Sequence, residues 1–199
     1  MLYRHYHTTH QEYYSRFIFP NDPDYFRGLL QRAGECPLTS CEIKFRNLHF
    51  GTGKKEITRE IGKPRFEIER GSQGFKYHIL FYKDNIKNIR FLLQLHLIND
   101  EFFFGCNTFK NLEYTKFGLV KSALFQKYTD IVNTGAGTQH SLADGRGNLI
   151  YFEENVLLRI CYITGDKNIL KTLSGYIDEC RKRSKKESDF MQESLMKLL

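Results

Sequence analysis

The stretch that decides the fold runs from Phe75 to Phe109 and reads FKYHILFYKDNIKNIRFLLQLHLINDEFFFGCNTF. Apolar and polar residues alternate along much of it, and aromatic and branched side chains are frequent, which is typical of antiparallel strands. Asn99-Asp100 interrupts the alternation, and both residues tolerate the left-handed conformation that a two-residue hairpin turn requires. The strands predicted from this pattern are 75–82, 87–98 and 101–109.

The alternation also predicts how the last two of these strands pair, because a shift of one residue would turn every side chain to the opposite face. With a two-residue turn between them, Leu97 lies opposite Phe102 and Leu95 lies opposite Phe104. The apolar faces of the two strands then coincide, so the turn and the pattern predict the same register.

The other hairpins are predicted by the same argument. A two-residue turn after the first strand would put apolar side chains on opposite faces, so we expect a loop with an odd number of residues, 84–86, that sets Phe81 opposite Ile89. A later hairpin around Glu154-Asn155 is expected to pair Tyr151 with Leu158.

Weaker signals on both sides of this region predict the remaining elements. Before it we expect a helix over 24–32, a strand over 43–50, a helix over 54–61 and a strand over 65–69. After it we expect a helix over 117–129, a loop over 133–147, strands over 149–153 and 156–163, and a final helix over 166–199, capped by Gly165 or Asp166.

These elements predict an α+β fold with a mostly antiparallel sheet of five to seven strands, helices packed on one face of the sheet and a long C-terminal helix. We expect residues 1–40 to form an N-terminal extension with a short helix. Residues 41–199 are expected to form a single α+β domain.

One segment carries a family resemblance. Residues 51–64 read GTGKKEITREIGKP and are followed by strands up to Lys83. This run resembles the helix-to-strand signature of the SmpA/OmlA family of small outer-membrane lipoproteins. The resemblance is confined to residues 51–83 and implies a similar helix-strand-strand element there, without a function for the chain.

Composition excludes several classes of protein. The chain has 199 residues, of which 41% are hydrophobic, and this is enough to build a core and excludes a disordered, collagen-like or simple coiled-coil chain. No apolar run is long enough to span a membrane, and the N-terminus lacks the apolar segment of a signal peptide. We therefore expect a cytoplasmic protein that has no membrane partner.

The cysteines and glycines indicate no cofactor. Five cysteines without a C-x-x-C pair argue against a disulfide framework and a structural zinc site, although Cys36 and Cys41 could pair in an oxidising compartment. The sequence FGTGKK at 50–55 lacks the spacing and the hydroxyl residue of a phosphate-binding loop, because Leu48 and Lys55 occupy the decisive positions. We expect no metal and no cofactor.

The predicted register places a mixed set of cationic, amide and aromatic residues on the sheet face opposite the core. Such a face suits an anionic or aromatic partner, and the alternative is a solvated face partly covered by helices. The candidate residues are Lys76, His78, Tyr82, Arg90, Gln94, His96, Phe103, Asn107 and Phe109.

A second candidate surface lies in the last helix, where cations are concentrated in the sequence RKRSKK. This cluster contains Arg181, Lys182, Arg183, Lys185 and Lys186, and accounts for much of the formal net charge of +7. It could contact nucleic acid or an acidic protein, and the alternative is an exposed helix turn.

No catalytic residues are predicted, because no nucleophile or paired-carboxylate pattern accompanies the histidines. We expect a non-enzymatic intracellular binding protein, adaptor- or immunity-like, with a protein partner. The alternative is a nucleic-acid-binding protein that uses the basic helix and the cationic sheet face. An enzyme would need His140 and Asp144, or His78 and His96, to converge in a pocket.

Apolar residues after the basic cluster also suggest a homodimer through the C-terminal helix.

Overall fold

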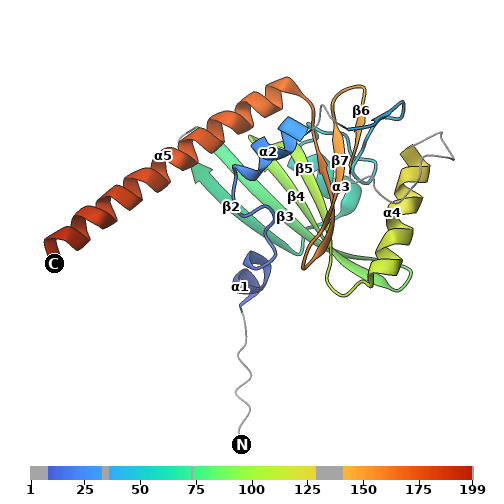
Figure 1. Cartoon of the computed structure of the whole chain (residues 1–199), viewed down its shortest axis with the longest axis horizontal. Coiled ribbons are helices and arrows are strands. Elements are labelled where there is room, and N and C mark those ends of the chain that lie inside the picture. The colour runs from blue at the N-terminus through green and yellow to red at the C-terminus, as the bar shows by residue number, and fades with distance from the viewer. Residues whose placement is uncertain (1–8, 33–35, 73, 129–140, 199) are drawn as a thin grey trace, which may run out of the picture.

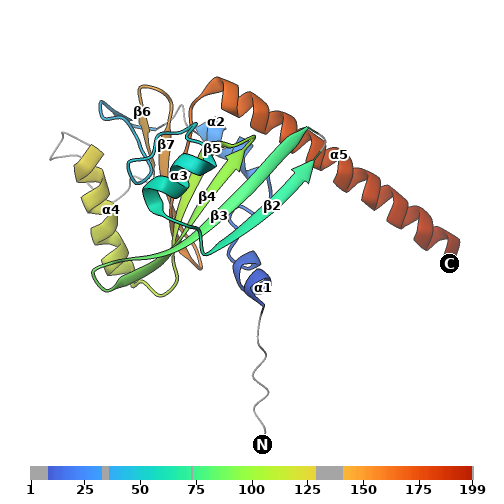
Figure 2. The ribbon, with the colours of Figure 1, turned by 180° about the vertical axis from the view of Figure 1, so that it is seen from behind.

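A computed structural model of the chain shows one mixed sheet with helices on both sides (Figures 1 and 2). The structure describes residues 9–32, 36–72, 74–128 and 141–198. The helices are α1 (His10–Ser15), α2 (Tyr25–Arg32), α3 (Lys54–Ile61), α4 (Tyr114–Tyr128) and α5 (Lys167–Leu198). The strands are β1 (Leu38–Thr39), β2 (Phe66–Ser72), β3 (Phe75–Ile86), β4 (Ile89–Ile98), β5 (Glu101–Phe109), β6 (Ser141–Asp144), β7 (Leu149–Glu154) and β8 (Leu158–Ile163).

The α+β class and the long C-terminal helix are confirmed, and the sheet is slightly larger than predicted. Its eight strands follow the order β1-β6-β7-β8-β5-β4-β3-β2. The pairs are antiparallel except β1 with β6, which is parallel and makes the sheet mixed. Both β1 and β6 are too short to give an alternating pattern, and β6 lies within the segment expected as a loop.

Helices cover both faces of the sheet, so the prediction that they pack on one face is wrong. One face, called here the α5 face, packs against α1, α2 and α5 through residues such as Tyr14, Phe26 and Leu173. The other, called the α4 face, packs against α3 and α4 through residues such as Ile57 and Phe117. Figure 1 shows α2 and α5 in front of the sheet, and Figure 2 shows α3 on the opposite side.

The segment 43–50 is not a strand. It folds back on itself in an isolated bridge between Phe45 and Leu48, and the two residues between them have positive φ angles of 52° and 65°. Ile43, Phe45 and Leu48 are nevertheless buried, because the segment packs on the α4 face. Its apolar spacing therefore reflects packing against the sheet and not pairing within it.

The hairpin between β4 and β5 follows the prediction only next to its turn. Leu97 pairs with Phe102 across Asn99-Asp100, whose φ angles are positive as predicted for this turn. A bulge between His96 and Leu97 then shifts the register, so that Leu95 pairs with Gly105 and not with Phe104. The bulge lets both Phe103 and Phe104 join the core of the α5 face.

Gly105 is required at this position by a close approach of another segment. A Cβ atom on Gly105 would lie 2.7 Å from atoms of the Phe45 ring, well inside normal contact distance. The aromatic ring of the 43–48 segment therefore packs directly on the backbone of β5, which a larger residue would prevent.

The other two predicted registers are wrong. The β3–β4 hairpin turns at Lys87-Asn88, and Phe81 pairs with Gln94 and not with Ile89. In the β7–β8 hairpin Tyr151 pairs with Cys161 and not with Leu158. The predictions assumed one apolar face for each strand, and this assumption fails where both faces are buried.

Residues 10–32 contribute to the core of the α5 face. Tyr14 of α1 stacks on Phe66 with ring centroids 5.0 Å apart, and Phe26 of α2 packs edge-on against Phe103. The segment expected as an extension thus packs on the same sheet as the rest of the chain. Among the described helices, none is both long and apolar enough to cross a membrane.

Candidate functional site

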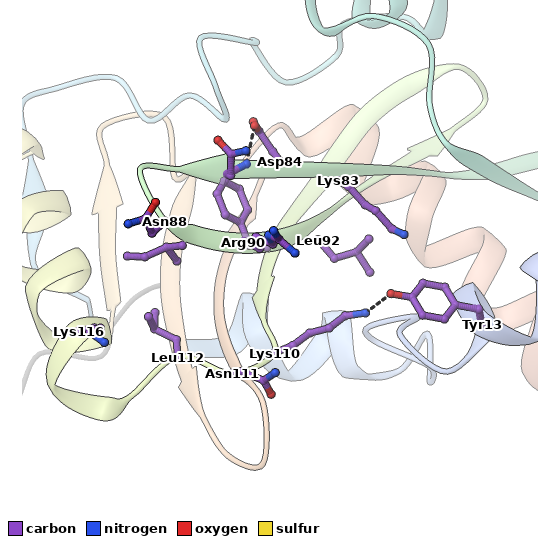
Figure 3. A pocket seen from close by; sticks show the side chains of 13 residues that line it. Tyr13, Lys83, Asp84, Asn88, Arg90, Leu92, Lys110, Asn111, Leu112 and Lys116 are labelled. Carbon is purple, nitrogen blue, oxygen red and sulfur yellow. Dashed lines mark hydrogen bonds between the residues drawn. The ribbon is translucent and has the colours of Figure 1, made fainter.

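A hollow in the surface lies at the free end of the β3–β4 hairpin (Figure 3). It has a volume of about 680 Å³ and is called here the hairpin groove. Four segments form it: α1, the hairpin, the chain that follows β5 and the first turns of α4. The lining residues are Tyr13, Lys83, Asp84, Asn85, Asn88, Ile89, Arg90, Phe91, Leu92, Lys110, Asn111, Leu112 and Lys116.

Two lysines converge on one aromatic ring at the α1 end of the groove. The Nζ atoms of Lys83 and Lys110 lie 5.0 and 4.4 Å from the centroid of the Tyr13 ring. Lys110 also donates a hydrogen bond to the Tyr13 hydroxyl and lies 3.5 Å from the centroid of the Phe17 ring. Ring faces attract cations but do not neutralise them, so both ammonium charges remain available.

The groove is strongly basic because its acidic residue is already paired. Asp84 forms an ion pair with Arg46, which is outside the groove. Lys116 pairs with Glu113 at 3.1 Å. Within the described part of the chain, Lys83, Arg90 and Lys110 have no carboxylate partner within ion-pair distance. Three unpaired cations therefore border one hollow.

Apolar side chains lie between these cations. The order of strands places β4 between β3 and β5, so Arg90 and Leu92 of β4 lie between Lys83 and Lys110. Ile89 and Leu112 also line the groove, and both pack against the core of the α4 face. The groove can therefore bind an anionic group and an aliphatic group at the same time.

Local structure holds Tyr13 in this position. The helix α1 begins with a capping box between Thr9 and Glu12, and the buried Tyr14 anchors it against β2 and β3. Gln94 of β4 binds the chain just beyond α1, because its side-chain amide donates to the Phe17 carbonyl and accepts from the Phe19 N–H. The groove wall is thus fixed to the sheet at two points.

The predicted sheet-face set does not lie on one face, because the register differs from the expected one. His96 and Phe103 belong to the α5 face, while Tyr82 and Phe109 belong to the α4 face. Side chains of Tyr82, Gln94, His96, Phe103 and Phe109 are buried. By strand alternation Lys76, His78 and Asn107 lie on the α4 face, and Arg90 and Gln94 on the α5 face. Of the whole set, only Arg90 lines the hairpin groove.

The two histidines of this set do not converge. His78 lies beside Glu67, with Nδ1 2.9 Å from the carboxylate, which also pairs with Lys54. His96 lies in the core, where its Nδ1 is 2.6 Å from the Tyr77 hydroxyl and its Nε2 has no partner in the described structure. Burial lowers the pKa of His96 to about 3, so the ring is neutral near pH 7.

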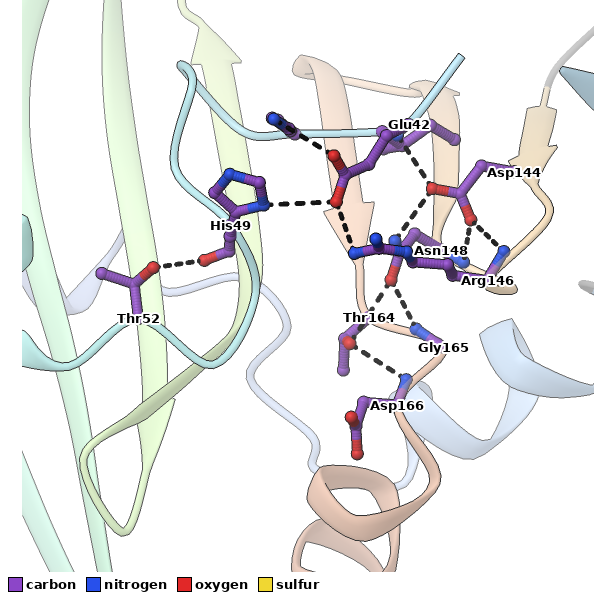
Figure 4. Close-up of polar contacts among 11 residues, drawn as sticks. Glu42, His49, Thr52, Asp144, Arg146, Asn148, Thr164, Gly165 and Asp166 are labelled. Carbon is purple, nitrogen blue, oxygen red and sulfur yellow. Dashed lines mark hydrogen bonds and ion pairs between the residues drawn. The ribbon is translucent and has the colours of Figure 1, made fainter. Parts of the chain in front are cut away.

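The second candidate for acid–base chemistry, Asp144, is occupied by structural hydrogen bonds (Figure 4). Its two carboxylate oxygens accept from the N–H groups of Ile43, Arg146 and Asn148 and from the Asn148 side-chain amide, all at 2.8–2.9 Å. A buried carboxylate with four such partners organises the β6–β7 turn, and its hydrogen-bonding capacity is used within the protein. His140 lies outside the described residues.

A smaller hollow of about 250 Å³ lies next to this carboxylate. Glu42 lines it and accepts contacts from Arg146 at 2.6 Å, Lys44 at 3.1 Å and His49 at 3.2 Å. The hydrogen bond from Lys44, helped by the nearby charges of Arg146 and His49, lowers the pKa of Glu42 despite partial desolvation. The cations around Glu42 therefore share a carboxylate partner, unlike those of the hairpin groove.

The basic cluster of α5 is exposed and lies where the helix leaves the body of the protein (Figure 1). Arg181 pairs with Asp24 at 2.7 Å, and Arg183 contacts the Gly71 carbonyl. Lys182, Lys185 and Lys186 form no ion pair with the described residues. The cluster lies beside the end of β2, where Arg183 contacts the Gly71 carbonyl, whereas the hairpin groove lies at the far end of β3, around the β3–β4 hairpin.

None of the five cysteines forms a disulfide in the structure, so Cys36 is not linked to Cys41. Cys36 donates to the Ser141 hydroxyl and packs against the core of the α5 face, whereas Cys41 packs against that of the α4 face.

Most of the hairpin groove was not predicted, because its residues come from four separate segments. The available signal was the excess of lysine at the ends of the central strands, at Lys83 and Lys110.

Comparisons with known proteins provide no relative for this chain. No family model, curated protein or solved structure matches it significantly. Residues 54–86 do form a helix followed by two strands, but this order alone identifies no family. A functional assignment therefore depends on the geometry of the chain.

Proposed function

We propose that this chain is a non-catalytic binding protein, and that the hairpin groove takes an acidic, partly apolar segment of a protein partner. The observation that carries the proposal is the pair of ammonium groups on the Tyr13 ring, which have no carboxylate partner among the described residues. Because both ammonium groups lie within 5.0 Å of the centroid of the same ring, an anion that binds beside this ring is attracted by both charges. A carboxylate of the partner supplies that anion.

The lining favours a polypeptide over nucleic acid. Nucleic-acid recognition without sequence preference depends on aromatic faces that are free to stack on bases. In the groove, the Tyr13 ring is already flanked by two lysines, and Phe91 is only 6% exposed. Ile89 and Leu112 instead offer aliphatic contacts beside the cations, which suits acidic residues interspersed with leucine or isoleucine.

The proposal is tested with a fluorescein-labelled peptide of alternating Glu and Leu, titrated at low ionic strength and followed by fluorescence anisotropy. We expect saturable binding that is weakened about tenfold or more in Lys83→Ala/Lys110→Ala, because two charge-assisted contacts are lost. The matched control is Lys182→Ala/Lys185→Ala in α5, which removes the same charge elsewhere and is expected to bind like the wild type. No saturable binding, or equal weakening in both variants, would overturn the proposal.

The alternative function is nucleic-acid binding, favoured by the three unpaired lysines of the α5 cluster. It predicts that a single-stranded oligonucleotide binds with an affinity that falls steeply with salt and that the Lys182→Ala/Lys185→Ala variant weakens. Because the two basic surfaces lie near opposite ends of β3, one short oligonucleotide should not depend on both. The same two variants therefore distinguish the two functions.

We also propose that the free part of α5 pairs with the α5 helix of a second copy. From residue 181 onward the described side chains are almost all exposed, including Phe190 at 72% and Met191 at 64%. The basic cluster over 181–186 is followed by Glu187, Asp189 and Glu193. In an antiparallel pair of helices, the basic part of one copy lies along the acidic part of the other.

A further inference from the structure

Two buried thiols face each other in the middle of the sheet. Cys106 of β5 pairs directly with Cys161 of β8, and their Sγ atoms are 3.4 Å apart. Both side chains are fully buried. The remaining cysteines, at positions 36, 41 and 180, are partly exposed and make no comparable contact with one another.

The hydrogen-bond pattern of the two strands shows that this is a suitable position for a disulfide. The Thr164 N–H donates to the Phe103 carbonyl at 3.0 Å, which identifies Phe103 and Thr164 as a hydrogen-bonded pair. This pair lies three positions along the two strands from Cys106 and Cys161. Alternation then makes Cys106 and Cys161 a non-hydrogen-bonded pair, for which the Cα atoms lie about 4.5 Å apart. Disulfides span Cα separations of about 4.4–6.8 Å, so the backbone does not have to move far.

We propose that Cys106 and Cys161 are the site of a disulfide that forms when the chain folds in the presence of a small-molecule disulfide such as oxidised glutathione. The two thiols lose two protons and two electrons as the Sγ–Sγ bond forms. The glutathione disulfide accepts both and leaves as two thiols, by way of a mixed disulfide on one of the cysteines.

The bond would join two parts of the sheet that meet only here. Strands β2 to β5 form a continuous meander, β6 to β8 form a second one, and the β5–β8 pair connects them. The two cysteines are 55 residues apart in sequence, so the crosslink closes a long loop in the unfolded chain. Burial also raises the pKa of the Cys161 thiol, so little of the reactive thiolate forms in the folded protein. After folding, the pair is therefore shielded from reagents, both as two thiols and as a disulfide.

The test is refolding from denaturant in a buffer of reduced and oxidised glutathione, followed by acid quenching, alkylation of the remaining thiols in denaturant and tryptic peptide mapping. We expect alkylation at positions 36, 41 and 180 only, and a linked pair of peptides that spans 91–110 and 160–167. Against protein refolded with reductant, the melting temperature should rise by roughly 5–15 °C.

Two variants complete the test. Cys36→Ala/Cys41→Ala should still give the linked peptides, and Cys106→Ala should lose both the link and the difference in melting temperature. Alkylation of all five thiols in the wild type, or a link that involves another cysteine, would overturn the proposal. This result is read from the wild type alone, so it does not depend on whether Cys106→Ala folds.

Discussion

Single residues of this chain show why polar side chains in the central strands do not make a binding face. His96 and Gln94 are polar, but both are buried, and each makes its hydrogen bonds inside the protein. Gln94 binds the backbone of the N-terminal segment, and His96 contacts the Tyr77 hydroxyl. Their hydrogen bonds specify which segments pack on the sheet, and burial requires His96 to stay uncharged.

His96 predicts a dependence of stability on acid. Its pKa is lowered by burial to about 3 in the folded protein, against 6.5 for an exposed histidine, so between these values the unfolded chain binds a proton that the folded chain refuses. The free energy of unfolding is therefore fully retained above pH 6.5 and falls as the pH drops toward 3. Between pH 6.5 and pH 4.5 this contribution is about 2–3 kcal/mol.

Urea unfolding at these two pH values measures this effect. The matched variant is His96→Gln, which can keep a hydrogen bond to Tyr77 and does not titrate. Its loss of stability in acid should be smaller than that of the wild type by about 2–3 kcal/mol. An equal loss of the free energy of unfolding in the two proteins between pH 6.5 and pH 4.5 would show that His96 is protonated in the folded state.

At the level of elements, the sequence predicts the helices and central strands well and their pairing poorly. The helix over 54–61 and the two-residue turn at Asn99-Asp100 are confirmed, because their signals are local. The registers fail because β4 is buried on both faces, so its alternation does not say which face is inside. The run Phe91-Leu92-Leu93 was the signal for this double burial.

The hairpin groove could not be predicted, because it depends on the same long-range packing.

The attachment of α1 to the sheet predicts an effect of Gln94 on the groove. Gln94→Leu keeps an apolar contact of similar size but leaves the Phe17 carbonyl and the Phe19 N–H without partners. We expect faster amide hydrogen exchange at Phe19 and the neighbouring residues, and weaker binding of the acidic peptide, because Tyr13 is no longer held beside Lys83 and Lys110. Stability should fall by about 1–3 kcal/mol.

The control for this variant is Glu113→Ala, which removes a surface ion pair next to the groove without loosening α1. It should leave exchange at Phe19 unchanged. If Gln94→Leu left both the exchange rate and the peptide affinity unchanged, the two hydrogen bonds would not be what positions α1.

At the level of the whole molecule, two surfaces of this chain, whose net charge is +7, carry cations without an ion pair among the described residues, and their surroundings differ. The hairpin groove combines unpaired cations with apolar walls, whereas the α5 cluster projects from the body on a helix whose last buried side chain, among those described, is Ile177. From residue 181 to 198, α5 extends about 27 Å at the rise of an α-helix. A helix of this length with exposed aromatic and methionine side chains gains stability only from a partner.

Removal of residues from Ser188 onward tests whether that partner is a second copy. The truncation deletes the exposed Phe190 and Met191 together with the acidic residues Asp189 and Glu193, but keeps the buried first turns of α5. Light scattering should give the mass of a dimer for the full chain and of a monomer for the truncated one. The full-length variant Glu187→Lys/Asp189→Lys should also shift toward monomer, because it opposes two basic segments, and this shift should be weaker at high salt. A full chain that is monomeric at all concentrations, or a truncated chain that remains a dimer, would contradict pairing through α5.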